Sequence, residues 1–121
     1  MMRSMYAGVS GLRTHQSKMD VIGNNIANVN TVGFKKGQMT FQEVFSQTMR
    51  GASAPQDGRG GTNPMQVGLG VGVGSINTIH TKGSMQPTDN PTDLMIDGEG
   101  FFVVSDDTNF ENRYYTRAGN F

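Results

Sequence analysis

The chain of 121 residues contains no cysteine and no tryptophan. Without cysteine it can form neither a disulfide nor a thiolate metal site, so the sequence is compatible with either redox compartment. No apolar run approaches the ~18 residues that a membrane-spanning helix needs, and the N-terminus lacks the hydrophobic block of a cleaved secretory signal. Composition alone therefore predicts no membrane insertion and a cytoplasmic location.

Patterns for catalysis, metals and cofactors are missing as well. His15 and His80 are the two histidines, and they lie in separate segments without a ligand spacing around either one. The acidic residues do not follow the EF-hand pattern, which leaves loose calcium binding at Asp106 and Asp107 as the alternative to turn chemistry. The sequence therefore predicts no enzyme and no cofactor, and no metal site beyond that alternative.

Glycine content and charge indicate an extended chain with a modest core. Glycine accounts for 17 of the 121 residues, about twice its usual share of ~7%. The net charge is zero, but residues 1–60 hold seven basic and three acidic side chains, and residues 61–121 hold three and seven. The basic residues are dispersed and form no patch with aromatic residues between them, so we expect no nucleic-acid binding.

The first region, residues 1–33, is predicted to be a long helix from about Ser4 to Asn28. Apolar residues recur there with the a/d spacing of a coiled coil. We call the following set the seam: Met5, Val9, Leu12, Met19, Ile22, Ile26 and Val29. Three interior glycines each cost about 0.8–1 kcal/mol, so we expect a helix that orders on assembly. A helix packed in an ordinary core is the alternative.

An asparagine-rich turn is predicted to close this helix. Asparagine tolerates the left-handed conformation, glycine permits a positive φ, and a phenylalanine can anchor the chain beyond the turn. The motif residues are Asn24, Asn25, Asn28, Asn30, Thr31, Gly33 and Phe34. This run and the opening Met2–Leu12 resemble the N-terminal signature of the rod and hook family of bacterial flagellar axial proteins.

Residues 34–82 are predicted to be a connector. Thr40 and Glu43 have the spacing of a capping box, and the apolar spacing behind them predicts a short helix at about 41–50. Residues 51–64 have almost nothing to bury and are typical of a flexible loop.

Residues 65–81 are predicted to be extended, because valine and leucine alternate there with glycine. A phosphate-binding loop is rejected, because Val73 stands where the third glycine would be and no helix follows. A bare strand face usually marks the close approach of another backbone. We expect a subunit contact there, with internal packing as the alternative, at Gly68, Gly70, Gly72 and Gly74.

Residues 83–121 are predicted to begin a β-rich middle domain. Leu94–Ile96 and Phe101–Val104 flank a glycine-containing turn and predict a β-hairpin, with a further strand at 113–117. The stretch Thr88–Phe102 and the ending Tyr115–Phe121 again resemble the rod and hook family. The predicted fold class is α+β: a long coiled-coil-type helix and a short helix, a glycine-rich connector, and the start of a β-rich domain.

The resemblance implies a structural subunit that self-assembles, as part of the hook or, alternatively, of the distal rod. A soluble protein-binding module is the alternative from another class. The implied partners are other copies, axial proteins of the rod, hook–filament junction and cap, the flagellar export apparatus, and a C-terminal helix that would follow Phe121 and pair with the first helix. The resemblance also implies a place in the flagellum, outside the cytoplasm, reached by type III export without a cleaved signal.

Overall fold

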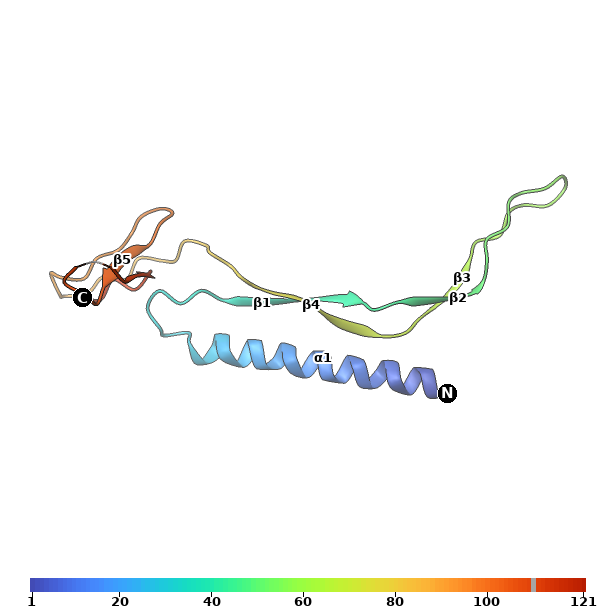
Figure 1. The fold of residues 1–121 in the computed structure, drawn as a ribbon, viewed down its shortest axis with the longest axis horizontal. Helices are drawn as coiled ribbons and strands as arrows, with labels where there is room; N and C mark the ends of the chain where they lie inside the picture. Colours follow the sequence, from blue (N-terminus) through green and yellow to red (C-terminus); the bar gives the residue numbers. More distant parts are fainter. Residues whose placement is uncertain (110) are drawn as a thin grey trace. The chain divides into compact units, whose positions relative to one another are not determined.

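The computed structural model describes residues 1–109 and 111–121, which divide into two compact units. Unit 1 comprises Met1–Val21 and Met39–Asn77, and unit 2 comprises Ile22–Gln38 and Thr78–Phe121. The elements in chain order are α1 (Met2–Ala27), β1 (Gly37–Glu43), β2 (Ser46–Arg50), β3 (Met65–Gly68), β4 (Val71–Thr78), β5 (Phe102–Ser105) and β6 (Arg113–Thr116) (Figure 1). The predicted α+β class is confirmed, while the predicted division into three regions stays a prediction.

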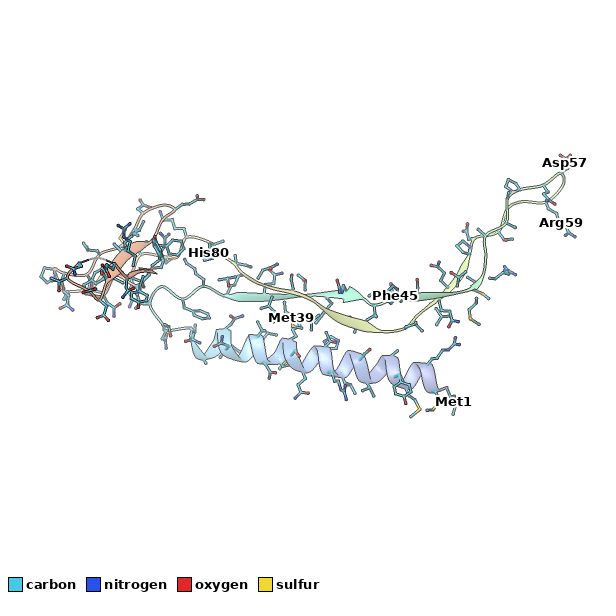
Figure 2. The ribbon with its side chains drawn as sticks, in the orientation of Figure 1. Met1, Met39, Phe45, Asp57, Arg59 and His80 are labelled. Carbon is cyan, nitrogen blue, oxygen red and sulfur yellow. The ribbon has the colours of Figure 1, made fainter. Side chains whose placement is uncertain are left out.

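In unit 1, strands β1 and β4 form a two-stranded sheet that runs alongside α1 (Figure 1). The hydroxyls of Thr40 and Ser75 lie 2.8 Å apart, and the Val44 N–H donates to Gly70 O at 3.1 Å, so the strands are antiparallel. Among the described residues the buried side chains are Met39 and Thr14, and Met39 lies between β1 and α1 (Figure 2). The core of this unit is therefore very small.

The prediction of a short helix at about 41–50 is wrong, because this stretch contributes to strands β1 and β2. The Thr40 hydroxyl, expected to cap a helix, instead meets Ser75 across the sheet. Leu69 N–H donates to Phe45 O at 2.8 Å, so the backbone at Phe45 also pairs with a distant segment, the link between β3 and β4. Pairing with a partner strand has overridden a local helix signal, as tertiary context often does.

Strands β2 and β3 form an antiparallel hairpin that continues into the predicted loop 51–64. Their register is Ser46 opposite Gly68, with an irregularity between Thr48 and Arg50. Beyond the strands, isolated bridges join Ser53 to Thr62 and Gln56 to Arg59. Gly58, with φ of 82°, closes the tip between Asp57 and Arg59 (Figure 2). Part of the predicted loop is thus an ordered hairpin end.

In unit 2, strand β5 pairs with β6, with Phe102 opposite Thr116. The predicted hairpin between Leu94–Ile96 and Phe101–Val104 is therefore wrong. Leu94 N–H donates instead to Gly119 O at 2.9 Å. The glycines that were expected to make a tight turn, Gly98 and Gly100, adopt φ of 128° and 147°, and a later part of the chain supplies the strand partner.

We predict that Gly70→Ala destabilises unit 1 by about 1–3 kcal/mol. Gly70 has φ of +130°, and an added Cβ would lie 2.5 Å from Ser10 Oγ. The matched control is Gly72→Ala, whose Cβ would lie 3.7 Å from its nearest neighbour, Val44 Cγ2, so its stability should change by less than about 0.5 kcal/mol. Urea unfolding followed by circular dichroism measures both, and equal effects would contradict the assignment.

Candidate assembly surface

One face of α1 binds the chain's own strand through two hydroxyls. Ser10 Oγ accepts from Val71 N–H at 3.4 Å and donates to Ala7 O at 2.7 Å. Thr14 Oγ1 lies 2.7 Å from Ser10 O and 3.4 Å from Val71 O. Small side chains on this face let the β4 backbone approach the helix closely, so the helix is held with little apolar contact.

A side chain added at most of the glycines in residues 68–74 would contact other atoms of this chain. A Cβ added at Gly68 would lie 2.5 Å from Glu43 Oε1, and one at Gly74 would lie 3.2 Å from Thr40 Oγ1. A Cβ added at Gly70 would likewise meet Ser10 Oγ, whereas one added at Gly72 would make only an ordinary van der Waals contact with Val44. These distances support the internal-packing alternative at Gly68, Gly70 and Gly74, and a subunit contact at the four glycines stays a prediction.

The seam is exposed: six of its residues lie on the other side of α1, and Val29 lies in the turn that follows the helix. Its seven side chains range from 36% exposed at Ile22 to 75% at Val29. Contiguous exposed apolar side chains of this kind usually mark a protein–protein contact. The seam therefore forms a candidate assembly surface that the described residues of this chain leave uncovered.

His15 and Lys18 lie where α1 meets β1. The His15 ring packs edge-on against Phe41, with centroids 5.4 Å apart. Lys18 Nζ lies 5.1 Å from the centroid of the same Phe41 ring, which gives a modest cation–π attraction. The histidine therefore packs against an aromatic ring at the edge of the seam.

The asparagine-rich turn is held by side-chain hydrogen bonds. Asn28 Nδ2 donates to Asn24 O at 2.9 Å, and Thr31 Oγ1 donates to Asn28 Oδ1 at 3.0 Å. Asn25 makes a two-bond clamp on the next segment. Its Nδ2 donates to Gly37 O at 2.8 Å, and its Oδ1 accepts from Gly37 N–H at 2.9 Å. The end of the helix is thereby fixed to the start of β1.

Gly33 fits the turn for two reasons. Its φ is +75°, a conformation that favours glycine, and an added Cβ would lie 2.7 Å from Ala118 N. The turn therefore packs against the backbone around residue 118, so the two family-like motifs contact each other within unit 2.

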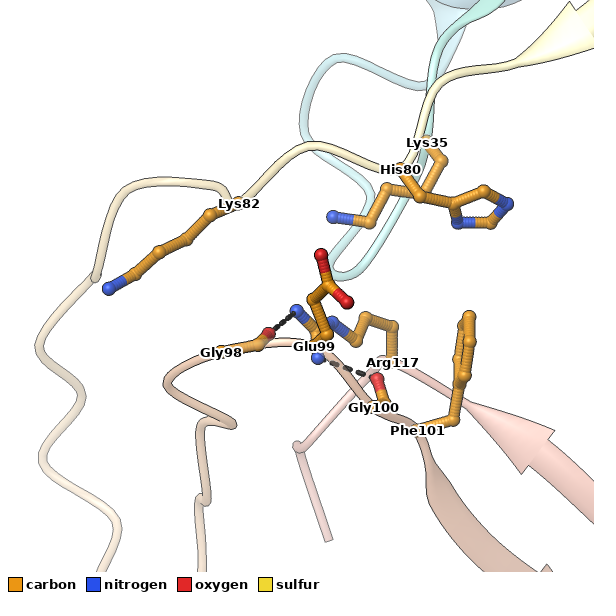
Figure 3. Close-up of a pocket in the computed structure, with 8 residues that line it drawn as sticks. All are labelled: Lys35, His80, Lys82, Gly98, Glu99, Gly100, Phe101 and Arg117. Carbon is orange, nitrogen blue, oxygen red and sulfur yellow. Dashed lines mark hydrogen bonds between the residues drawn. The ribbon is translucent and has the colours of Figure 1, made fainter.

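A surface hollow of about 470 Å³ lies beside this turn (Figure 3) and is lined by Lys35, His80, Lys82, Gly98, Glu99, Gly100, Phe101 and Arg117. The Arg117 guanidinium donates to Gly98 O and to Gly100 O, each at 2.6 Å. The arginine thus holds the glycine turn open, which explains why this turn does not form the predicted tight hairpin. Lys35 is also engaged, since its Nζ donates to Thr81 O at 2.7 Å.

Lys82, which lines the hollow, forms an exposed ion pair with Asp97. The hydrogen bond from Lys82, and then its charge, hold the pKa of the Asp97 carboxyl below its usual value. Such exposed pairs contribute little to stability.

No group of three or more His, Cys, Asp or Glu side chains that could hold a metal occurs among residues 1–109 and 111–121. In the same ranges, no helix has the length and apolar character to cross a membrane.

Sequence reasoning missed the residues that hold α1 to the sheet, namely Ser10 and Thr14, and the role of Arg117. The signal for the first two was a stripe of small or polar residues on the face opposite the seam. It runs through Ala7, Ser10, Thr14 and Ser17, with the same helical period as the seam. The Arg117 contacts reach back 17 and 19 residues, and no local pattern marks them.

Comparison with known proteins finds one matching family and several proteins of similar sequence. The family described as flagella basal body rod protein matches residues 5–35, which contain the seam and the asparagine-rich turn. Over all 121 residues the chain is 60% identical to the flagellar hook protein FlgE of Borreliella burgdorferi and 52% identical to that of Treponema pallidum. It is 54% identical to the flagellar basal-body rod protein FlgG of Bacillus subtilis. The chain spans 27%, 26% and 45% of these relatives' lengths.

We predict that Asn25→Ala accelerates amide exchange at Gly37 and lowers stability by about 1–2 kcal/mol, because both bonds of the clamp are lost. The control is Asn24→Ala, which removes one exposed acceptor of Asn28 Nδ2 and should cost less than about 0.5 kcal/mol. Hydrogen exchange read by NMR or mass spectrometry measures the difference. Unchanged exchange at Gly37 in Asn25→Ala would show that the clamp does not fix the turn.

Proposed function

We propose, from the chain's membership of the flagellar rod and hook protein family, that it is part of a structural subunit that self-assembles in the axial structure of the bacterial flagellum. Within that structure we assign it to the hook. The whole-chain similarity to hook proteins at up to 60% identity supports this assignment. The chain covers about a quarter of those relatives, so the function of the whole protein is part of the proposal.

The observation that carries the proposal is the exposed seam. Six of its seven apolar residues lie on one face of α1 and Val29 follows the end of the helix, while the opposite face of α1 binds β4 through Ser10 and Thr14. Covering seam residues with another helix removes apolar surface from water, which stabilises an assembly by roughly 25 cal/mol per Å² buried. An axial subunit needs such a partner helix, because its stability in a fibre depends on contacts that the free chain lacks.

The distal rod is a second candidate, favoured by the 54% identity to the rod protein of Bacillus subtilis over the whole chain. The two candidates differ in the polymer that they form. Purified subunits that polymerise into curved, flexible tubes support the hook, and straight, stiff rods support the alternative. Electron microscopy of the polymers distinguishes them.

The partners follow from the same proposal. They are other copies of the subunit, neighbouring axial proteins of the rod, the hook–filament junction and the cap, and the export apparatus through which an axial subunit leaves the cell without a cleaved signal. A C-terminal helix of the same subunit is a further proposed partner for the seam. No catalytic role is proposed, since the relatives are named as hook and rod proteins.

We predict that Leu12→Asp and Ile26→Asp each abolish polymerisation. Both side chains lie in the seam and are well exposed, so a charge there is tolerated in the free chain but is buried without a partner on assembly. Sedimentation of polymer measures the effect, and circular dichroism checks that the free subunit remains folded.

The control for both variants is Arg13→Asp, which adds the same side chain to the adjacent position, outside the seam. It changes the net charge by more than Leu12→Asp does, so a general charge effect would be larger in the control. Normal polymers from Leu12→Asp, or equal loss in Arg13→Asp, would refute the assignment of the seam.

A further inference from the structure

Two of the seven seam residues are methionines, Met5 and Met19, which are 63% and 64% exposed. We propose that these two thioethers are sites of reversible oxidation by peroxide, and that their oxidation prevents the seam from pairing. The inference rests on the proposed assembly role of the seam. It adds a modification site and a chemical condition under which the free subunit loses the ability to assemble.

The reaction is balanced by one molecule of peroxide for each thioether. The methionine sulfur attacks one oxygen of hydrogen peroxide, the O–O bond breaks and an S–O bond forms. The sulfur gives up two electrons, which reduce the peroxide, and the second oxygen leaves as water. The product is methionine sulfoxide, which methionine sulfoxide reductases convert back to the thioether.

Exposure determines which methionines peroxide can reach. Of the nine methionines in the chain, Met39 is buried at 7% exposure, between β1 and α1 (Figure 2). Met39 therefore serves as an internal reference for slow oxidation. The other six methionines are exposed and lie outside the seam: Met1, Met2, Met49, Met65, Met85 and Met95.

The position of Met5 and Met19 makes their oxidation consequential. Fourteen residues separate them, which is about 21 Å along the helix at ~1.5 Å per residue, with Leu12 midway. A sulfoxide replaces a soft apolar group with a strong hydrogen-bond acceptor. When the seam pairs, that acceptor is buried among apolar side chains with no donor opposite, which opposes association at both ends of the seam.

Assembly should protect the same two residues. A partner on the seam covers Met5 and Met19, so peroxide reaches them much more slowly in a polymer than in free subunits. The free subunit is therefore the sensitive state, and an assembled axial structure is resistant. The oxidation rate at Met5 and Met19 also reports directly on whether the seam is covered.

The test treats the full chain with hydrogen peroxide and maps sulfoxide at each methionine by peptide mass spectrometry. In free wild-type subunits, Met5 and Met19 should oxidise at least about tenfold faster than Met39. The critical concentration for polymerisation should then rise at least about tenfold, and methionine sulfoxide reductases should restore it. In preformed polymers, oxidation at Met5 and Met19 should slow by a similar factor.

Two double variants make the result specific. Met5→Leu with Met19→Leu keeps the seam apolar without a thioether, and should polymerise after peroxide treatment within about twofold of its untreated value. Met49→Leu with Met65→Leu removes two exposed thioethers outside the seam, and should respond as wild type does. Two results would overturn the inference. One is that peroxide treatment abolishes polymerisation of the Met5→Leu, Met19→Leu double variant. The other is that wild type polymerises normally with both seam methionines oxidised.

The outcome separates this inference from the proposed function. If untreated wild-type subunits do not polymerise, or if untreated Leu12→Asp polymerises normally, the assembly role of the seam fails and the inference fails with it. If untreated protein polymerises, Leu12→Asp does not, and fully oxidised protein still polymerises, only the inference about oxidation is wrong.

Discussion

The contact between two hydroxyls of α1 and the backbone of β4 is the interaction on which unit 1 depends. Ser10 and Thr14 both lie 3.4 Å from backbone atoms of Val71, and Thr14 is one of the two buried side chains named in the fold. Because this face is small and polar, it lets the strand approach without using the apolar residues of the helix. The strand in turn needs glycine at position 70, where a side chain would meet Ser10. The apolar seam is left free as a direct consequence, and a helix with so little covering of its own gains most from a partner.

A second constraint acts at the end of the helix, within unit 2. The Asn25 side chain pairs with both the N–H and the C=O of Gly37, as a strand backbone would. Gly33 brings the turn against the backbone of Ala118. The asparagine-rich run therefore both ends the helix and fixes the next segment to it. This explains in physical terms why asparagine and glycine stand at these positions in a chain whose proposed work is to present one helix face to neighbours.

The sequence predicted the features that depend on nearby residues. The helix, its seam and the asparagine-rich turn follow from a heptad spacing and from the local chemistry of asparagine and glycine, and the structure has α1 end at Ala27 with the seam exposed. The errors came where distant segments decide. Thr40 has the spacing of a helix cap, but Ser75, 35 residues later, is its partner. The local pattern predicts a hairpin of Leu94–Ile96 with Phe101–Val104, but the carbonyl of Gly119 accepts the Leu94 N–H. No pattern within ten residues of either site distinguishes these outcomes, because strand pairing is set by tertiary contacts.

The central claim is that α1 uses its small polar face within the chain and keeps its seam for a partner. The absence of native cysteine allows a direct measurement with single introduced thiols at Thr14, which is 6% exposed, and at Leu12, which is 73% exposed. We expect a thiol reagent to label Leu12→Cys rapidly and Thr14→Cys slowly in free subunits, and to label both slowly in polymers. Rapid labelling of Thr14→Cys in the free subunit, or rapid labelling of Leu12→Cys in the polymer, would contradict the account.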